Sequence, residues 1–546
     1  MSTTTFTPAG RRRLRRIGQG TVALLAASAL AAGCSSSADT GGATGTAESV
    51  DGYRVGLVNQ QGDDGDPVRG GTLVTGTQLL VNSLDPVATG ARGGSGGEAL
   101  ALVYDVLMQY DVESGEFSPK LADKLEANDD YTEWTLTLRD GVRFSDGTDL
   151  DADAVVASIE RYNAGNGNGA SLWNSSVDET VAVDDTTVKF SLSLPWQRFP
   201  SMLALGHGMI VAPSAGDGED FTPIGAGPFT HESFNPGEEH VFVANPDYFD
   251  GEPYLDQITM VAMNGPQANL ESLQSGQLDI AYIRGLGSAI HTAIDEGYPG
   301  LVGVLNAGGA ELINNRDERP GNDVRVRQAI AHAIDPDLID ERVEEGQGLP
   351  GSELFGKTST WHTDEAGPDF DPDKARELLD EAKADGYDGT LGYVVLNEPK
   401  DFAIGQTVST LLEAVGFEVD LQPQASATDL LGKVYADHDF DLAHAGIGLY
   451  ESIIDLGLES TTFSTSPSNI VGYSDEQMDE LILELQQATD DEAPGIISQI
   501  QQRWNETVPS AVVSAMPSVF AWQHSVHGVQ TTATDILLYD KVWIED

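Results

Sequence analysis

The sequence predicts an α/β fold, in which strands and helices alternate along the chain. A half-buried strand is indicated at Trp134–Leu138, where apolar and polar residues alternate. An amphipathic helix is indicated beyond residue 320, where apolar side chains recur with a period of 3.6 residues on one face: Val324, Ala329, Ile330, Ala333 and Ile334. Both patterns occur in the two halves of the chain without a visible internal repeat, which favours strands covered by helices.

The N-terminal half contains a short strand between two turns. Asp140-Gly141 and Asp146-Gly147 are turn dipeptides on either side of Val142–Phe144, and a helix is expected directly after the second turn. That helix is expected at Asp151–Tyr162. The further elements expected in this half are a first strand at Gly70–Val74, a helix at Leu100–Met108, and strands at Thr187–Leu194 and His240–Ala244.

Helix starts are also visible in the C-terminal half. Asp371 is suited to be an N-cap and Pro372 to be the first helical residue, so a helix is expected from here to about Gly386. Ser474 and Gln477 have the spacing of a capping box, which predicts a second helix beyond them.

The N-terminus has the pattern of an export signal. An arginine cluster between residues 11 and 16 precedes an apolar run, Ile17–Ala32, and small residues then lead to Cys34. A basic segment remains in the cytoplasm while an apolar segment enters the bilayer. We therefore expect residues 1–33 to be a signal peptide and the remaining chain to act outside the cytoplasm.

Cys34 is the only cysteine in the chain, so it cannot form an internal disulfide. Its position after Ala31-Ala32-Gly33 resembles a bacterial lipobox, in which the cysteine is diacylated and becomes the mature N-terminus. Acyl chains on that residue would be enough for stable anchoring. Two alternatives remain open: a freely secreted protein with an incidental cysteine, and a permanent membrane helix, although the run is shorter than the about 20 residues such a helix needs.

Composition limits the possible partners. The formal net charge is −58, from 87 acidic and 29 basic residues. Nucleic acid is excluded as a natural partner, since its binding depends on Lys and Arg. Anionic lipid would also repel the chain, which makes a covalent anchor more useful. Residues 34–67 are rich in Ser, Gly, Thr and Asp, and we expect them to form a flexible linker.

Several sequence blocks identify a family. In chain order they are Leu102–Leu107, Tyr131–Gly147, Gly225–Phe229, Asn245–Asp256, Leu273–Asp279, Asp323–Ile330, Phe370–Ala375, Val415–Val419 and Gly472–Ser474. On these blocks, over about residues 68–530, the chain resembles the bacterial extracellular solute-binding proteins of family 5, which serve oligopeptide, dipeptide and nickel ABC importers.

The resemblance implies a two-lobed clamp of the type II periplasmic-binding-protein kind with an additional N-terminal subdomain. Lobe I is then expected at 68–95, 205–305 and 515–546, the subdomain at 96–204 and lobe II at 306–514. The implied function is that of a receptor, monomeric and without a cofactor, which closes two hinge strands around a ligand and delivers it to membrane permease and ATPase subunits. The ligand implied is a peptide, with nickel or another small solute as the alternative.

The resemblance also suggests ligand-binding residues. Peptide-binding members pair an aspartate of the second lobe with the ligand's ammonium group, and the corresponding segment here offers Asp455 first and Glu451 second. A carboxylate is needed there because a buried ammonium must be paired. Other expected lining residues are the aromatic side chains Tyr450, Trp361 and Phe463 and the loop residues Gly93, Gly94 and Ser95.

Two other functions have some support in the sequence. Gly93–Gly97 formally matches the G-x-S-x-G pattern of serine hydrolases, which requires a strand before Ser95 and a helix after it. Metal capture is the other alternative, because nickel binders share the scaffold that the resemblance implies. The candidate ligands are two spaced histidine pairs, neither with a visible third ligand: His438 with His444, and His524 with His527.

Overall fold

The computed structural model describes residues 52–62, 65–78 and 80–545. Its largest element is one mixed sheet of twelve strands, with the main order β16-β15-β17-β13-β18-β12-β2-β11-β10-β9. Two long strands, β13 (Gly300–Ile313) and β18 (Ser510–Trp522), run antiparallel in its middle and separate two groups of shorter strands. The α/β class and the two-lobed arrangement expected from the sequence are both present.

Lobe I contains the strands on one side of β18. β2 pairs in parallel with both β11 and β12, whereas β10 is antiparallel to both of its neighbours, β9 and β11. The helices α4 and α5 cover part of this region and pack against β12. The elements are β2 (Thr72–Thr77), β9 (Phe229–Asn235), β10 (Glu239–Ala244), β11 (Gln257–Ala262), α4 (Pro266–Gln274), β12 (Ile280–Arg284) and α5 (Gly287–Asp295).

Lobe II contains the strands on the far side of β13. β15 lies in parallel between β16 and β17, and α9 packs against β15 and β16. The elements are α6 (Val324–Ala333), α7 (Pro336–Val343), β14 (Leu349–Pro350), α8 (Pro372–Ala384), β15 (Thr390–Leu396), α9 (Pro399–Val415), β16 (Glu418–Gln424), α10 (Ala427–Leu431), β17 (Leu442–Ala445), α11 (Ile454–Thr462), α12 (Glu476–Gln487) and α13 (Ala493–Thr507).

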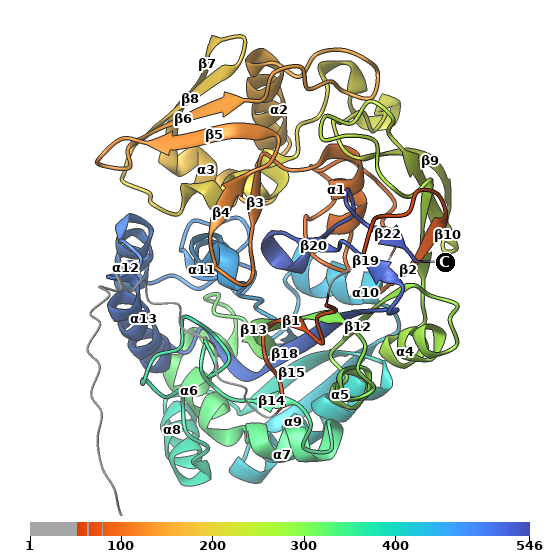
Figure 1. The fold of residues 1–546 in the computed structure, drawn as a ribbon. Coiled ribbons are helices and arrows are strands. Elements are labelled where there is room, and N and C mark those ends of the chain that lie inside the picture. The colour runs from red at the N-terminus through yellow and green to blue at the C-terminus, as the bar shows by residue number, and fades with distance from the viewer. Residues whose placement is uncertain (1–51, 63–64, 79, 546) are drawn as a thin grey trace, which may run out of the picture. The chain divides into compact units, whose positions relative to one another are not determined.

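The subdomain has a separate sheet. Four antiparallel strands take the order β5-β6-β8-β7, and α2 and α3 pack against β7. Figure 1 shows this sheet at the top, α6–α9 at the bottom and β13 and β18 between them. The elements are β5 (Ala122–Ala127), β6 (Glu133–Leu138), α2 (Ala152–Ala164), α3 (Ala170–Ser176), β7 (Val177–Asp184) and β8 (Thr187–Leu192).

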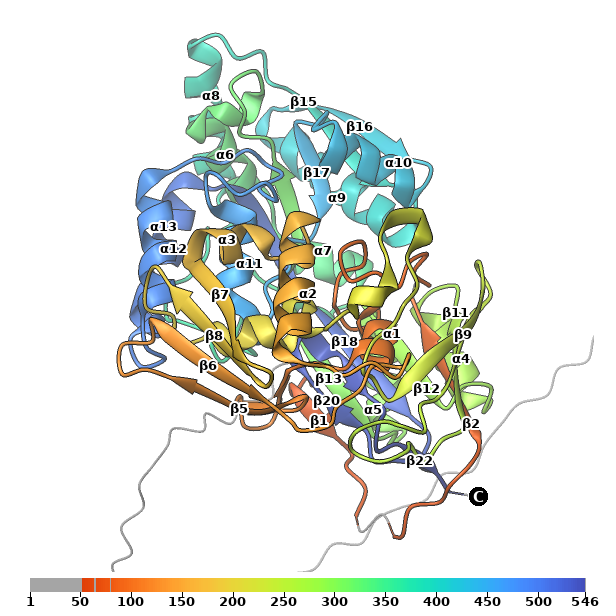
Figure 2. The same ribbon diagram turned by 90° about the horizontal axis from the view of Figure 1, so that it is seen from above.

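β13 and β18 connect the two lobes, and the ladder of hydrogen bonds between these strands is interrupted at one place. Regular pairing runs from Gly300 to Leu305 and resumes at Gly309, with the register shifted at both edges of the gap. Within the gap, Ala307 has a left-handed backbone (φ 48°). The domain boundaries expected at 305/306 and 514/515 are close to this break in the chain and stay a prediction. In Figure 2 the strands β15–β17 lie in the upper part of the view, and β2, β9 and β11 lie in the lower part.

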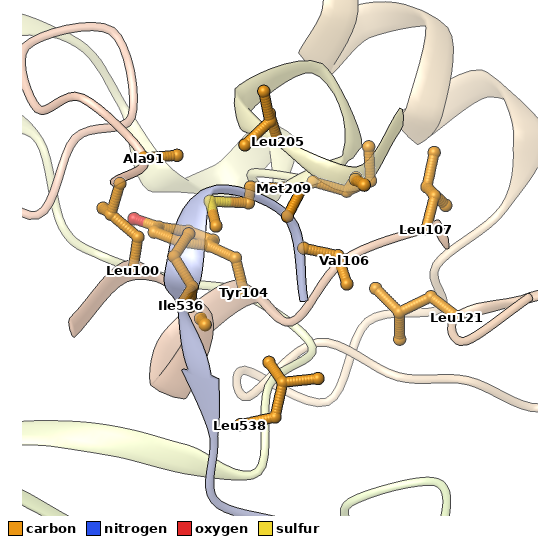
Figure 3. Close-up of a cluster of buried hydrophobic side chains, with 14 of the residues drawn as sticks. Ala91, Leu100, Tyr104, Val106, Leu107, Leu121, Leu205, Met209, Ile536 and Leu538 are labelled. Carbon is orange, nitrogen blue, oxygen red and sulfur yellow. The ribbon is translucent and has the colours of Figure 1, made fainter. Parts of the chain in front are cut away.

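The C-terminal segment ties the subdomain region to lobe I. Ile536 and Leu538 are buried in a cluster with side chains of α1 (Gly97–Tyr104) and of the chain that follows it, as Figure 3 shows. Helix α1 packs against β9 and β21, so it associates with lobe I although it was expected in the subdomain. Small two-stranded sheets complete the fold: β3 (Met108–Tyr110) with β4 (Phe117–Pro119), β19 (Val526–His527) with β22 (Trp543–Ile544), and β20 (Gln530–Thr531) with β21 (Leu537–Leu538).

Three local features differ from the sequence expectations. Asp475, rather than Ser474, caps α12, because its side chain accepts the backbone N–H of Met478. Val142–Phe144 is reduced to an isolated bridge between Arg143 and Asp149. The helix expected to reach Met108 ends at Tyr104, and Met108 starts β3 instead.

The N-terminal predictions can be compared with the structure only in part. Residues 1–33 and Cys34 lie outside the described residues. Within the expected linker 34–67, β1 (Gly56–Val58) pairs with β13, and Tyr53 is buried. This stretch therefore belongs to the folded body, because its apolar side chains find partners there. Among the described residues, no helix has the length and apolarity needed to cross a bilayer.

Candidate ligand-binding site between the two lobes

Segments of both lobes meet at the break in the β13–β18 ladder. Asn306, in the break, exchanges backbone hydrogen bonds of 3.1 and 2.9 Å with Leu449, which follows β17 of lobe II. From the C-terminal segment, Thr534 donates its backbone N–H to Ser452 Oγ of lobe II over 3.2 Å. This junction is the candidate site because groups of both lobes lie within reach of one ligand there.

Asp535 comes to the junction from the short helical turn Ala533–Asp535. Thr534 and Asp535 both have left-handed backbones, with φ of 59° and 61°, a conformation that Asp tolerates better than most residues. Thr534 fixes the turn: its carbonyl accepts the N–H of Gly93 and its hydroxyl donates to the carbonyl of Ala91, each over 2.9 Å. A Cβ on Gly303 would lie only 2.2 Å from Asp535 Oδ2, so the glycine leaves room for the carboxylate.

The glycine-rich loop packs closely on this turn and on β12. A Cβ on Gly93 would lie 2.5 Å from the carbonyl oxygen of Asp535, and one on Gly94 would overlap the Tyr282 ring at 2.0 Å. Gly94 also has φ of +66°, a conformation that favours glycine. The loop expected to line the cleft thus supports Asp535 and Tyr282. Contact of its glycines with a ligand stays a prediction.

Arg284 lies at the end of β12 beside Tyr282. Its Nε donates to the thioether sulfur of Met516 over 3.1 Å, and a sulfur is a weak acceptor. No ion pair joins Arg284 to a carboxylate anywhere in the described part of the chain. Burial lowers the pKa of Arg284, but Tyr282, Tyr450 and Asp535 together raise it above its ordinary value. The guanidinium therefore stays charged.

Two carboxyl groups at the junction have raised pKa values. Glu98, in the first turn of α1, is 4% exposed, and both its oxygens accept the N–H of Gly94. Burial raises the pKa of Glu98 to about 8. Burial also raises the pKa of Asp535 to about 6, although Arg284 opposes this effect while Glu451 adds to it. The strand register agrees with this influence of Arg284, because Arg284 and Gly303 are both paired with Ser518 and the Asp535 carboxylate lies over Gly303.

Lobe II contributes Tyr450 and Glu451. Tyr450 is buried, and the guanidinium of Arg92 lies 6.0 Å from its ring centre, within cation–π range. Glu451 accepts from Asn306 Nδ2 over 2.8 Å and from the backbone N–H and hydroxyl of Thr360. Trp361 donates its indole N–H to the Glu451 carbonyl over 3.1 Å. These residues expected from the sequence are brought together here.

Asp455 lies deeper in lobe II, in the first turn of α11, and is 5% exposed. Its carboxylate accepts the indole N–H of Trp196 over 2.8 Å and two guanidinium N–H groups of Arg198 over 2.9 and 3.1 Å. Trp196 and Arg198 follow the subdomain sheet, so Asp455 fastens that region to lobe II. Its role as an ammonium anchor stays a prediction, and the carboxylate already has a cation.

Phe463 and Ser95 form no side-chain hydrogen bond or ion pair with these charges among the described residues. Phe463 ends α11 and packs against the lobe II core. Ser95 lies in a turn whose backbone N–H donates to the carbonyl of Arg92 over 3.2 Å, and turns rather than a strand precede it. A nucleophile elbow needs that strand, so the local structure gives the hydrolase alternative no support.

The histidine pairs serve other contacts. His444 Nδ1 lies 3.0 Å from Glu311, and His438 contacts the carbonyl of Val434. His527 stacks on Trp543 and His524 on Tyr298. Within the described ranges, no group of three or more His, Cys, Asp or Glu side chains is arranged to hold a metal ion.

Sequence reasoning missed Arg284, Asp535, Glu98 and Tyr282. One signal was available: Arg284 follows the apolar strand Ile280–Ile283 directly, and a charge at a strand end often lies at a site. Asp535 gave no signal, since it is one acid among 87 in a C-terminal segment without a recognisable motif. Its position depends on the turn around Thr534.

Two α/β lobes that share a pair of crossover strands, with charges of both lobes at the crossing, define a solute-binding clamp. Residues 116–465 match the middle region of the bacterial extracellular solute-binding proteins, family 5. The chain belongs to this family.

Related proteins and structures agree with this assignment. The chain is 31% identical over 372 residues to a "probable peptide ABC transporter periplasmic-binding protein" of Sinorhizobium fredii, covering 62% of this chain and 68% of that one. It is 26% identical to the dipeptide-binding protein of Escherichia coli, over 51% of this chain and 57% of the relative. The match thus spans only a little over half of that second relative.

Solved structures share the fold at lower identity. The oligopeptide-binding protein AppA of Bacillus subtilis, in complex with a nonapeptide, superimposes with a TM-score of 0.75 at 21% identity, covering 88% of this chain and 100% of AppA. DppA of Helicobacter pylori, in complex with the peptide STSA, gives 0.73 at 22% identity, covering 88% and 99%. The two-lobed clamp with an added subdomain is therefore the fold of this protein.

Proposed function

We propose that this protein is an extracytoplasmic receptor that binds a peptide or a related small charged solute between its lobes and delivers it to the permease and ATPase subunits of an ABC importer. The observation that carries the proposal is the contact of both lobes at the crossover strands, where Thr534 donates to Ser452 and Asn306 donates to Glu451. Recognition requires no catalytic step and no cofactor.

The break in the β13–β18 ladder supports a hinge. Residues 306–308 are not paired with β18, and a few backbone dihedrals there can absorb a change in lobe angle. The loop after β17 also bonds to this segment, because Ile447 donates its N–H to the carbonyl of Ala307 over 3.0 Å. Closing the lobes would then bring Tyr450 and Glu451 onto the ligand.

A distance measurement tests the hinge. After Cys34→Ser removes the single cysteine, Glu238→Cys in lobe I and Asp380→Cys in lobe II provide exposed labelling sites. We expect the distance between two probes on these residues to shorten on adding ligand. A pair within lobe II, at Asp380 and Glu484, is the control and should not change. An unchanged distance between lobes at saturating ligand would contradict hinge closure.

The receptor role is tested by its ligand. Native mass spectrometry of the purified protein should show a bound small molecule, because ligands enclosed between lobes dissociate slowly. Calorimetry with peptide mixtures and with Ni²⁺ as a comparison then gives the ligand class. Absence of any bound or bindable small solute would contradict the proposal.

Anchoring at Cys34 would hold the monomeric receptor at the outer face of the cell membrane, near its importer. Metabolic labelling with a palmitate analogue should mark the wild-type protein and not Cys34→Ala. Release of the variant into the medium should accompany the loss of label. Equal labelling of both proteins would contradict the anchor.

A further inference from the structure

Asp535 is a partly buried carboxylate without a hydrogen-bond donor among the described residues. It accepts no bond from a side chain or backbone N–H, whereas the backbone around it is held tightly by Ala91, Gly93 and Ser452. Burying a carboxylate without a partner is costly. The turn that holds Asp535 thus keeps in place an acceptor that the protein itself does not use.

Arg284 is the matching cation. Its guanidinium is close enough to Asp535 for each to change the pKa of the other, yet the two side chains do not form an ion pair with each other. Its Nε is bonded to sulfur and it also has a side-chain hydrogen bond with Tyr282, but both partners are neutral, and carboxylates bind guanidinium much more strongly. Arg284 therefore has capacity for an external carboxylate.

Both groups belong to lobe I and lie on one face of the central sheet: Arg284 and Gly303 are both paired with Ser518, and a Cβ on Gly303 would lie 2.2 Å from Asp535 Oδ2. Arg284 ends β12, and Asp535 ends a turn that packs on the glycine loop, which itself contacts Tyr282 of β12. A ligand that satisfies both has to present its positive and its negative charge close together. An extended peptide does not provide this, because its ammonium and carboxylate are separated by about 3.3–3.6 Å for each residue in between.

The remaining charges favour a ligand of zero net charge at this end. Glu451 has its own donors in Asn306 and Thr360, and Arg92 lies over the Tyr450 ring. Glu98 is held by the N–H of Gly94 and is neutral near pH 7, given its raised pKa. Among the described residues at this junction, Asp535 and the half-buried Arg284 then have no opposite charge of the protein in contact, while Arg92, which also lacks a carboxylate partner, is exposed.

We propose that the ligand carries an α-amino-acid head, an ammonium and a carboxylate on the same carbon, with the ammonium bound by Asp535 and the carboxylate by Arg284. The rest of the ligand extends towards Tyr450 and lobe II. This inference rests on the proposed receptor function and specifies which end of the solute lobe I recognises. Free amino acids, and conjugates linked through a side chain such as γ-glutamyl dipeptides, carry the head, whereas α-linked peptides do not.

Calorimetry with matched probes tests the head. The probes are free L-amino acids and γ-glutamyl dipeptides, their N-acetyl derivatives, their α-amides, and α-linked tripeptides. We expect binding of compounds with the intact head, and a loss of more than about tenfold on N-acetylation or amidation, since either change leaves one buried charge without its partner.

Two substitutions assign the charges. Asp535→Asn should weaken binding of intact heads by more than about tenfold and leave the already weak N-acetyl compounds unaffected. Arg284→Gln should likewise weaken binding of intact heads by more than about tenfold, and it should leave the binding of the already weak α-amides unaffected. The double variant Arg143→Gln with Asp149→Asn removes an exposed pair (3.3 Å, side chains 59% and 72% exposed) and is the matched control, expected to bind as the wild type does. Thermal unfolding of each variant checks that it is folded.

The outcomes separate the two proposals. If α-linked tripeptides bind and neither Asp535→Asn nor Arg284→Gln changes their affinity, the proposed recognition of an α-amino-acid head is wrong, and the receptor function stands. If no probe binds, the molecule found by native mass spectrometry decides: one with the head supports the inference and one without it overturns it. If no small molecule is found either, the receptor function fails together with the inference.

Discussion

Asp535 and Asp540 lie in the same C-terminal segment, but their environments differ. Asp540 is 1% exposed at its side chain, and its Oδ2 lies 3.1 Å from Nζ of Lys120, which is also buried. Asp105 adds a second buried carboxylate there, bonded to Tyr248. Asp535 has neither a cation in contact nor a hydrogen-bond donor among the described residues. The paired cluster is suited to hold the fold together, and the unpaired one to receive a ligand.

The largest expected effect comes from breaking the paired cluster. Lys120→Met leaves Asp105 and Asp540 buried without their cation, so we expect the free energy of unfolding to fall by roughly 3–5 kcal/mol. Urea denaturation with an unchanged slope measures this. Lys124→Met, which removes an exposed pair with Glu126, should cost no more than about 1 kcal/mol. Equal losses in the two variants would contradict the distinction.

Asp455 extends the comparison to lobe II. Because Arg198 and Trp196 are bonded to it, Asp455→Asn should lower stability by an amount in the range of roughly 3–5 kcal/mol, with ligand affinity unchanged. Asp490→Asn removes the other carboxylate on Arg198, which lies 3.3 Å away and is 64% exposed, and should have little effect. If Asp455→Asn stays stable and loses binding, the ammonium anchor predicted from the sequence is Asp455 after all.

The buried carboxyl group of Glu98 makes the stability of the protein depend on pH. Its folded pKa of about 8 lies above the ordinary 4.5, so the folded protein retains a proton that the unfolded chain releases. The contribution of Glu98 to the free energy of unfolding is complete below pH 4.5 and is lost as the pH rises to about 8. Between these two values the free energy of unfolding falls by about 1.4 kcal/mol per pH unit.

Glu98→Gln keeps a neutral side chain at every pH. The variant should therefore match the wild type near pH 4.5 and be more stable than it at pH 8, as unfolding free energies at several pH values would show. Glu126→Gln, on an exposed strand position, should follow the wild type throughout. A constant difference between Glu98→Gln and the wild type across this range would contradict the raised pKa.

The smallest effect is expected at a contact between the lobes. Lys400, in the first turn of α9, donates to the carbonyl of Gly285 in lobe I and pairs with Glu344. Because the lysine is 38% exposed, Lys400→Met should weaken ligand binding by less than about fivefold, the equivalent of 1 kcal/mol. The change should appear in the dissociation rate. A loss as large as that of Asp535→Asn would mean that closure, rather than the charges of lobe I, dominates affinity.

Local patterns predicted most of the elements. Asp151, Asp323 and Asp371 each cap a helix through their side chains, and the strands around Trp134 and Thr187 pair as the alternation implies. These features depend on neighbours in the chain, so local chemistry is enough to find them. The candidate site was predicted in part: Tyr450, Glu451 and Trp361 do come together at the junction, whereas Asp455 is engaged by Arg198.

The sequence by itself determined the α/β class, the family and the caps that start several helices, because these follow from periodicity and from motifs of adjacent residues. Only the tertiary structure decided which carboxylates are paired. Asp455 meets an arginine 257 positions away, Asp540 meets Lys120, and Asp535 meets none. Pairing of charges depends on distances in space and on exclusion of water, and among 87 acidic residues neither can be read from the order of the chain.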